Sequence, residues 1–151
     1  MKAGSCLLEE IMEKITVTQE KLNELFELAM KASEFSYSPY SKFPVGAAIL
    51  TSDGRIFTGC NVENRSFGLT NCAERTAMFK AVSEGAKRIL ALAIATPKSD
   101  YPVGPCGACR QVMTEFGDND VPVIFGCSNA NLTKATLGEL YPFDSLHELA
   151  D

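Results

Sequence analysis

Two short segments of the sequence carry side chains whose types and spacing could do chemistry. Cys72-Ala-Glu74 places a thiol two positions before a carboxylate, and Cys106-Gly-Ala-Cys109 places two thiols three positions apart. Cys-x-x-Cys by itself also fits a redox pair, half of a zinc knuckle or two small core residues. A structural zinc site requires four protein ligands, whereas three thiolates leave the open position of a catalytic zinc. His147 is the only histidine of the sequence, which excludes a zinc site built from several histidines.

Together the two segments match a known zinc signature, in which Cys or His, any residue and Glu precede a Pro-Cys-x-x-Cys segment. Cys72 fills the first position, and Pro105 stands directly before Cys106. This is the signature of zinc-dependent nucleobase deaminases. A structural zinc has no use for a carboxylate that does not bind the metal, so Glu74 favours a catalytic site over a non-catalytic zinc-binding interaction module.

From about residue 18 to residue 149, the chain resembles the small, homotetrameric cytidine deaminases. The resemblance is carried by the segments Tyr40-Ser-Lys-Phe43-Pro-Val-Gly-Ala, Gly59-Cys-Asn61-Val-Glu63-Asn64, Cys72-Ala-Glu74-Arg75-Thr-Ala77 and Pro105-Cys106-Gly-Ala-Cys109-Arg-Gln111-Val. It implies zinc-dependent hydrolysis of cytidine and deoxycytidine to uridine or deoxyuridine and ammonia, as in pyrimidine salvage. It also implies one zinc ion per chain and a homotetramer with shared active sites.

The resemblance assigns the chemistry of the zinc site to five residues. Cys72, Cys106 and Cys109 would hold the zinc, and Glu74 would carry protons from water to the ring nitrogen and the leaving amine. Three thiolates on a +2 ion leave a net charge of −1, which weakens the metal as a Lewis acid. The N-termini of the two helices that the ligand segments open would offset part of this charge. Arg75 would offset more by hydrogen-bonding the ligand sulfurs.

Four further residues match the substrate-binding positions of the family. Phe43 would lie against the pyrimidine, and the backbone of Ala73 would read the edge of the base. Asn61 and Glu63 would bind the sugar hydroxyls from one face of a strand end, since alternate residues of a strand share a face. A carboxylate beside a neutral amide suits a hydroxyl and repels a phosphate, which favours nucleosides over nucleotides.

Three aromatic residues are candidates for contacts between subunits: Phe67, Phe143 and Tyr40. The C-terminal sequence departs from the family, because Phe143 follows Pro142 directly instead of standing in a later segment. Gly104 also stands where the family usually has serine before the Pro-Cys-Gly-Ala-Cys segment. Of the three remaining cysteines, Cys60 and Cys127 are expected to be buried small apolar residues, and Cys6 has no assigned role.

The composition of the chain limits its number of domains, its class of substrate and its location. The chain has 151 residues and a formal net charge of −5, which suits one globular domain and disfavours a nucleic-acid substrate. We find no apolar run long enough to span a membrane. Acidic residues interrupt the N-terminal segment, so it does not read as a signal peptide, and a cytoplasmic location is expected. Residues 1–17 are expected to be an extension, with a short helix over residues 6–15, and residues 18–151 a single catalytic domain.

The elements that must position these residues alternate along the chain. A helix is expected to begin after Thr18, its N-cap, and to end before residues 36–41. The pattern then predicts a hairpin over 45–50 and 55–59, a helix over 73–82, a strand over 89–95, a helix over 108–116, strands over 121–125 and near 131–134, and a short capped helix from 136. Strands that alternate with helices predict a three-layer α/β/α sandwich around a mixed, largely buried sheet.

Two other readings of the same motifs stay open. A deaminase of an aminoacyl nucleoside such as blasticidin S shares the zinc motif but lacks the full Gly-Cys-Asn-x-Glu-Asn segment, so Asn61 and Glu63 argue against it. Editing of a polynucleotide is disfavoured by the acidic net charge.

Overall fold

The computed structural model describes residues 15–144 and residue 149 of the chain. The helix expected over residues 6–15, Cys6 and His147 therefore lie outside the described residues, apart from Ile15. The elements follow in the order α2 (Gln19–Ser33), β1 (Gly46–Thr51), β2 (Ile56–Cys60), η1 (Phe67–Leu69), α3 (Ala73–Ser83), β3 (Ile89–Ala95), α4 (Gly107–Phe116), β4 (Pro122–Ser128), β5 (Asn131–Thr136) and α5 (Leu137–Leu140).

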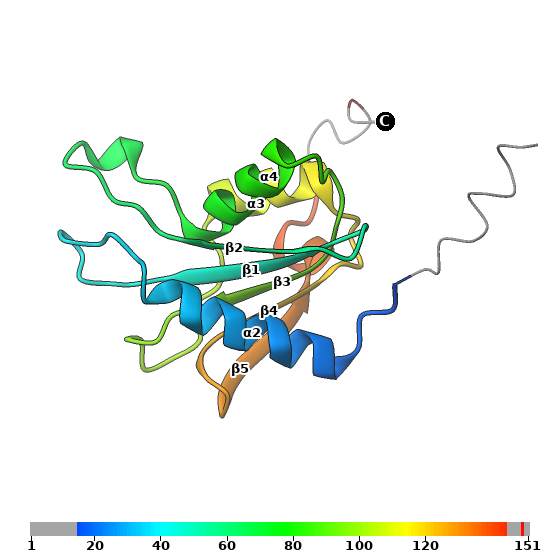
Figure 1. Ribbon diagram of the computed structural model, residues 1–151, viewed down its shortest axis with the longest axis horizontal. Coiled ribbons are helices and arrows are strands. Elements are labelled where there is room, and N and C mark those ends of the chain that lie inside the picture. The colour runs from blue at the N-terminus through cyan, green and yellow to red at the C-terminus, as the bar shows by residue number, and fades with distance from the viewer. Residues whose placement is uncertain (1–14, 145–148, 150–151) are drawn as a thin grey trace, which may run out of the picture.

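A five-stranded sheet in the order β2-β1-β3-β4-β5 forms the middle layer. β3 and β4 run parallel, and every other neighbouring pair runs antiparallel. α2 covers one face of the sheet, and α3 and α4 lie together on the other (Figure 1). The predicted three-layer sandwich with a mixed sheet is confirmed.

Helix α2 begins and packs as its sequence predicts. The Thr18 side chain accepts a hydrogen bond from the Lys21 backbone N–H at 3.1 Å, which satisfies one of the free donors of the first turn. Leu22, Leu25 and Ala29 are buried on the face that meets the sheet. The helix ends at Ser33, before the turn residues that were expected to stop it.

Strand β3 explains how helices cover both faces of the sheet. Its large residues Leu92 and Ile94 point into the core beneath α3 and α4. The alternate residues Ala91, Ala93 and Ala95 point into the core beneath α2. Because successive side chains of a strand point to opposite faces, this small–large alternation gives α2 a shallow surface to approach.

Two glycines let helices approach the sheet closely. A Cβ added at Gly46 would lie 1.9 Å from the backbone oxygen of Ala29 in α2. A Cβ added at Gly59 would lie 2.5 Å from the backbone nitrogen of Ala77 in α3. Real Cβ contacts this short do not occur, so both strands need glycine where a helix crosses them.

The same helix layer brings the two cysteine segments together. Cys72 is the N-cap of α3 and Cys106 is the N-cap of α4, each with extended backbone angles. α3 and α4 contact one another on the same face of the sheet. The thiols therefore project from the beginnings of two neighbouring helices.

The expectation for the two other described cysteines is wrong. Cys60 and Cys127 are half-buried, not buried. Cys60 is the last residue of the edge strand β2, and its thiol donates to the Phe35 backbone oxygen at 3.4 Å. Cys127 lies near the end of β4, where the strand passes from buried to exposed residues. Both sit at or near strand ends, where they are only partly covered.

Candidate metal centre and active site

Three thiols converge where α3 and α4 begin. The Sγ atoms of Cys72, Cys106 and Cys109 all lie within 4.8 Å of one another. Cys109 is buried, Cys72 is half-buried and Cys106 is exposed, so one side of the cluster is open. Cys109 lies one turn into α4, which turns its side chain back toward the two N-cap positions.

The spacing of the thiols fits a tetrahedral zinc ion. Zinc binds thiolate sulfur at about 2.3 Å, so two sulfurs on one tetrahedral ion lie about 3.8 Å apart. The Cys72 and Cys106 sulfurs are 3.7 Å apart. Three sulfur ligands leave a fourth position free, which is the arrangement of a catalytic rather than a structural site.

Positive groups surround the cluster. An Nη of Arg75 donates to the Cys72 sulfur at 3.3 Å. Among the described residues, the N-cap residues of α3 and α4 make no side-chain cap hydrogen bond. The backbone N–H groups in the first turn of each helix therefore remain free at the end that carries the cysteines. A hydrogen bond from the Cys109 thiol, together with Arg75, lowers the pKa of Cys72 to about 5.

The pKa of the Cys109 thiol shifts in the opposite direction from that of Cys72. Its hydrogen bond to Cys72 and its burial raise the pKa of the Cys109 thiol well above the ordinary value. Three thiolates this close repel one another, so a divalent cation is the partner that lets all three ionise together. The donor set therefore fits zinc in its chemistry as well as in its geometry.

Glu74 is the one carboxylate that the structure sets beside these thiols within the described residues. It is 4% exposed and follows Cys72 by two positions at the beginning of α3. Burial, together with the negative charge on Cys72, raises the pKa of Glu74 to about 7. A buried carboxyl group poised near neutrality is suited to accepting and releasing protons.

A cavity of about 170 Å³ opens onto this cluster. It brings together six of the nine residues that the sequence nominated for the zinc site and the substrate. Its lining is Phe43, Val45, Asn61, Thr70, Cys72, Ala73, Glu74, Ile94, Thr96, Val103, Gly104 and Cys106. Ile94 and Thr96 stand at the carboxyl end of β3, the edge where α/β sheets commonly bind ligands. Glu63 is not among the lining residues.

Asn61 is held in place on three sides. Its Oδ1 accepts from the Ser36 hydroxyl at 2.5 Å and from the Val45 N–H at 2.9 Å. Its Nδ2 donates to the Phe43 backbone oxygen at 2.9 Å. An amide nitrogen has two N–H groups, so one donor of Asn61 is free of these contacts.

The carboxylate of Glu63 accepts hydrogen bonds from the turn that precedes β1. One oxygen accepts from the backbone N–H groups of Tyr40 at 3.0 Å and Ser41 at 3.2 Å, and the other accepts from the Ser41 hydroxyl. The Ser41 hydroxyl is the main cause that lowers the pKa of Glu63. A carboxylate offers about four lone-pair positions, so roughly one is left for a ligand.

Comparison with known proteins places this geometry in a family. The profile of the cytidine and deoxycytidylate deaminase zinc-binding region matches residues 19–125, more than half of the chain. The chain belongs to this zinc-binding deaminase family. The match spans the segments that supply all three thiols and Glu74.

Individual members of the family are similar over most of the chain. The cytidine deaminase of Sporosarcina psychrophila is 48% identical over 121 residues, which cover 80% of this chain and 88% of that protein. The crystal structure of cytidine deaminase from Burkholderia pseudomallei aligns with a TM-score of 0.77 at 43% identity, covering 84% of this chain and 98% of that one. The blasticidin-S deaminase of Bacillus cereus is 33% identical over 138 residues, covering 87% of this chain and 96% of that protein.

The aromatic residues nominated for subunit contacts lie outside the deaminase cavity of their own chain. Phe67 is 73% exposed on η1 and meets the Tyr40 ring edge-on, with ring centroids 5.7 Å apart. Both sit on segments that project beyond one end of the sheet (Figure 1). Phe143 is fully exposed.

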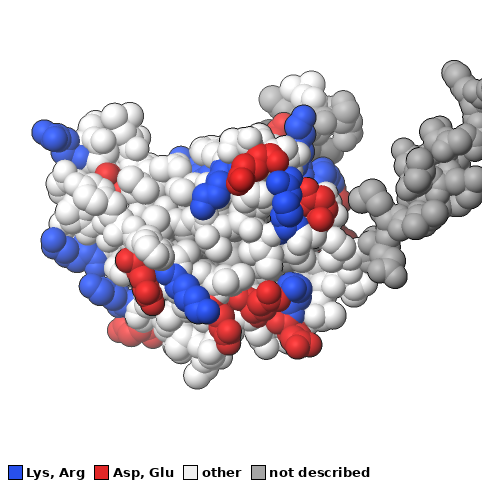
Figure 2. Space-filling view, viewed as in Figure 1, with Lys and Arg blue, Asp and Glu red and all other residues white. Residues whose placement is uncertain are grey.

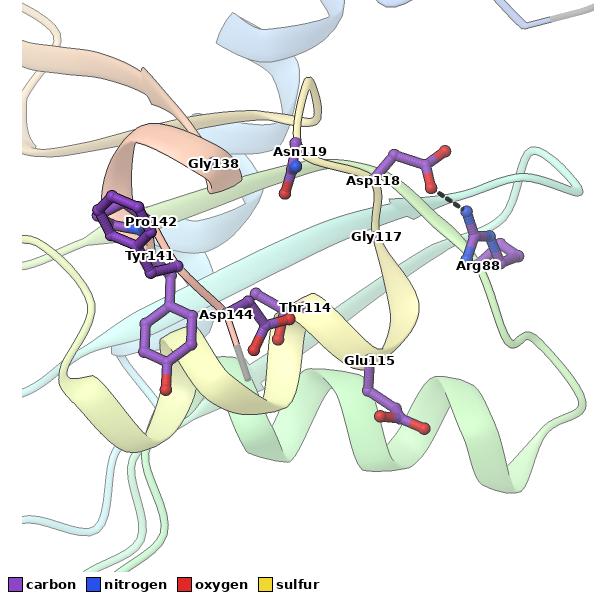
Figure 3. Close-up of a pocket in the computed structure, with 11 residues that line it drawn as sticks. Arg88, Thr114, Glu115, Gly117, Asp118, Asn119, Gly138, Tyr141, Pro142 and Asp144 are labelled. Carbon is purple, nitrogen blue, oxygen red and sulfur yellow. Dashed lines mark hydrogen bonds and ion pairs between the residues drawn. The ribbon is translucent and has the colours of Figure 1, made fainter. Parts of the chain in front are cut away.

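Phe143 lines a different hollow, of about 350 Å³, between α4 and α5 (Figure 3). This hollow shares no lining residue with the cavity at the thiols. An ion pair of 2.5 Å between Arg88 and Asp118 lies at its side. None of the metal or proton-transfer candidates reaches it, so it adds nothing to the deaminase chemistry.

Sequence reasoning missed the residues that support the site. Ser36 and Ser41 contact the nominated sugar-binding residues, and Arg110 donates to the backbone oxygens of Pro105 at 2.7 Å and Leu140 at 2.8 Å. Arg110 thereby ties the turn before Cys106 to the end of α5. Both Ser41 and Arg110 stand inside the segments that carry the family resemblance, which was the available signal.

Proposed function

We propose that the chain hydrolyses the C4 amino group of cytidine and deoxycytidine, giving uridine or deoxyuridine and ammonia. The observation that carries the proposal is a cluster of three thiols beside a cavity that two of them, Cys72 and Cys106, line together with one buried carboxylate, Glu74. Membership of the zinc-binding deaminase family and the 48% identity to a cytidine deaminase support it. Cys72, Cys106 and Cys109 would hold one zinc ion per chain.

Zinc, when bound, supplies a hydroxide nucleophile at neutral pH by lowering the pKa of water. Glu74 takes the first proton of the attacking water and passes it to the ring nitrogen N3. It then takes the proton of the new C4 hydroxyl and gives it to the departing amine, so both protons of the water are accounted for. Its carboxyl pKa of about 7 allows it both to accept and to release a proton near neutral pH. Arg75 holds the Cys72 sulfur in place and compensates part of the thiolate charge.

The remaining residues orient the nucleoside. Phe43 lines the cavity and offers its ring to the pyrimidine, while the buried backbone of Ala73 meets the edge of the base. Asn61 retains one free N–H and Glu63 retains about one free lone pair. A hydroxyl group both accepts and donates, so this pair suits a single sugar hydroxyl, which we assign as the 3′-hydroxyl. Such a site accepts cytidine and deoxycytidine alike.

The similarity to the blasticidin-S deaminase of Bacillus cereus points to blasticidin S as the alternative substrate. An aminoacyl nucleoside would share the zinc chemistry but would present a different sugar edge to Asn61 and Glu63. Polynucleotides are disfavoured by the net charge of −5. On the face of the molecule in Figure 2, basic side chains are interspersed with acidic ones.

One assay tests the proposal directly. Purified protein should convert cytidine and deoxycytidine, followed by the fall in cytidine absorbance, and a zinc chelator should abolish the conversion. Blasticidin S and single-stranded DNA serve as the competing substrates in the same assay. Conversion of blasticidin S with no turnover of cytidine would assign the alternative substrate and refute ours.

We also propose a homotetramer whose subunits share their active sites. A cavity of about 170 Å³ is smaller than the roughly 300–1,000 Å³ of pockets that enclose a ligand. A neighbouring subunit would complete the wall, with Phe67 as the first candidate, and Tyr40 and Phe143 as further ones. Closed, symmetric assemblies let every subunit both give and receive such a residue.

Mixing two inactive variants tests the shared site. Glu74→Ala lacks the proton carrier but keeps Phe67, and Phe67→Ala has the reverse defect. Refolded hybrids should regain activity, because some sites combine an intact zinc shell from one chain with Phe67 from another. Full assembly of both variants by size-exclusion chromatography, with no activity in the hybrids, would show that Phe67 serves its own chain.

We place the activity in the cytoplasm and in pyrimidine salvage, with residues 18–151 as the catalytic domain and residues 1–17 as an extension. Thiols that must stay reduced to bind zinc favour a reducing compartment. No helix of the described residues is long and apolar enough to cross a membrane.

A further inference from the structure

The turn before β1 is organised around one side-chain hydroxyl. The Ser41 O–H donates to Glu63 Oε1, and the same oxygen accepts from the Phe43 backbone N–H at 3.1 Å. Ser41 thus joins the residue nominated for the sugar to the residue nominated for the base. No other side chain among the described residues hydrogen-bonds to both Glu63 and the Phe43 backbone.

The other oxygen of Glu63 holds the backbone of the same turn. Oε2 accepts from the N–H groups of Tyr40 and Ser41, and the next residue, Lys42, has a φ of +58°. L side chains adopt this left-handed region at an energetic cost, so the surrounding contacts must hold the turn in it. The Lys42 N–H closes the turn on the Ser38 backbone oxygen at 3.0 Å.

These contacts fix how Glu63 can meet a ligand. Oε2 already accepts two bonds, so the free lone-pair position belongs to Oε1, the oxygen that Ser41 holds. Without the Ser41 hydroxyl, Oε1 would have no protein donor among the described residues. The carboxylate could then turn about its last bond, and its free lone pair would lose a defined direction.

We propose that Ser41 is a positioning residue that aims Glu63 Oε1 at the 3′-hydroxyl of the bound nucleoside. This inference rests on the proposed deamination of nucleosides and adds a residue to its sugar specificity. Ser41 is not itself among the residues that line the cavity, nor is it one of the thiols, so we infer that it acts on the ligand through Glu63.

The test compares two variants of the same shape. Ser41→Thr keeps the hydroxyl, and Ser41→Val replaces it with a methyl group in an otherwise matched side chain. Ser41 is exposed, so both side chains have room. Ser41→Ala gives a third variant that adds no bulk, and Ser38→Ala is the control, because the Ser38 hydroxyl contacts the Ser36 hydroxyl and neither Glu63 nor Phe43.

Each protein is assayed for kcat and KM on cytidine and on 3′-deoxycytidine, which lacks the hydroxyl that Glu63 would bind. A hydrogen bond to a charged group is worth about a tenfold change in equilibrium. We expect Ser41→Val and Ser41→Ala to lower kcat/KM for cytidine about tenfold, mainly through KM. We expect no comparable loss on 3′-deoxycytidine, and Ser41→Thr and Ser38→Ala should behave as the wild type.

Comparing cytidine with 3′-deoxycytidine distinguishes two roles of Ser41: aiming Glu63 at the 3′-hydroxyl, or supporting the turn in general. Equal losses on both substrates would show that Ser41 supports the turn or Phe43 and does not aim Glu63, which overturns the inference. A wild type that converts both substrates equally well would overturn it too, because no 3′-hydroxyl would be recognised. A wild type that converts neither would instead refute the proposed function. If Ser41→Ala does not fold, as judged by its melting curve, the Thr and Val pair decides alone.

Discussion

Replacing Glu74 with glutamine tests the centre of the proposed chemistry. Glutamine keeps the shape of the side chain but cannot accept a proton from water. Glu74 is 4% exposed and lines the cavity at the thiols. Apart from Glu74 and two cysteines, every lining side chain is non-ionisable, so none of them can carry the proton in its place.

The expected loss in kcat is large because no other side chain lining the cavity can replace Glu74 as proton carrier. A positioned general acid or base contributes about 10²- to 10⁴-fold to a rate. Glu74 would serve at both proton relays with no substitute nearby, so we expect kcat to fall by about 10⁴-fold or more. A 10⁴-fold loss corresponds to about 5 kcal/mol on the barrier.

The assay pairs kcat on cytidine with the zinc content of the same preparation. Glu74→Gln should keep zinc, since the three thiols are unchanged, and should melt as a folded protein. Glu27→Gln is the matched control, because Glu27 is an exposed residue of α2 on the opposite face of the sheet. A Glu74→Gln protein that holds zinc and keeps a tenth of the wild-type kcat would refute the assignment of the proton carrier.

Three further predictions follow from the same structure. Cys106→Ala should lose most of its bound zinc, measured by metal analysis, and unchanged zinc content would remove the proposed site. CMP should show a much lower kcat/KM than cytidine, because Glu63 repels a phosphate near the sugar edge; comparable values would contradict that reading. Gly46→Ala should lower the free energy of unfolding in urea by about 1–3 kcal/mol or more, since its Cβ would meet the Ala29 oxygen, whereas Gly68→Ala, with no described atom within 4 Å, should not.

Local patterns in the sequence were sufficient for the architecture. The Thr18 cap, the hairpin of β1 and β2 and the capped helix from residue 136 all form as predicted. The hairpin turns at Gly54, which has a φ of +85°. Each depends on residues close together in the chain, which is why a single sequence reveals them. The alternation of strands and helices then leaves few arrangements besides a layered sandwich.

Contacts between distant residues were not accessible in the same way. The motif spacing indicated that Cys72 and Cys106 belong together, but their 3.7 Å separation depends on α3 and α4 lying on one face of the sheet. The bond from Ser41 to Glu63 joins residues 22 positions apart, and no local rule predicts it. The half-burial of Cys60 likewise follows from β2 being an edge strand, a property of the sheet order.

The four α-helices of the described residues divide into two kinds by their N-cap residues. α2 and α5 begin after Thr18 and Thr136, whose side chains accept backbone hydrogen bonds. α3 and α4 begin after Cys72 and Cys106, which make no side-chain cap bond among the described residues. An N-cap hydroxyl or carboxylate is typically worth about 1 kcal/mol.

The helices at the candidate site therefore forgo a stabilisation that the other two retain. What they gain is a pair of helix N-termini whose unsatisfied N–H groups and partial positive charges lie beside sulfur atoms. Those charges, together with Arg75, favour the thiolate form that binds zinc. The same charges offset the excess of three negative ligands over a divalent ion and so preserve its ability to polarise water. The two N-cap cysteines thus trade helix stability for a metal site of the right charge.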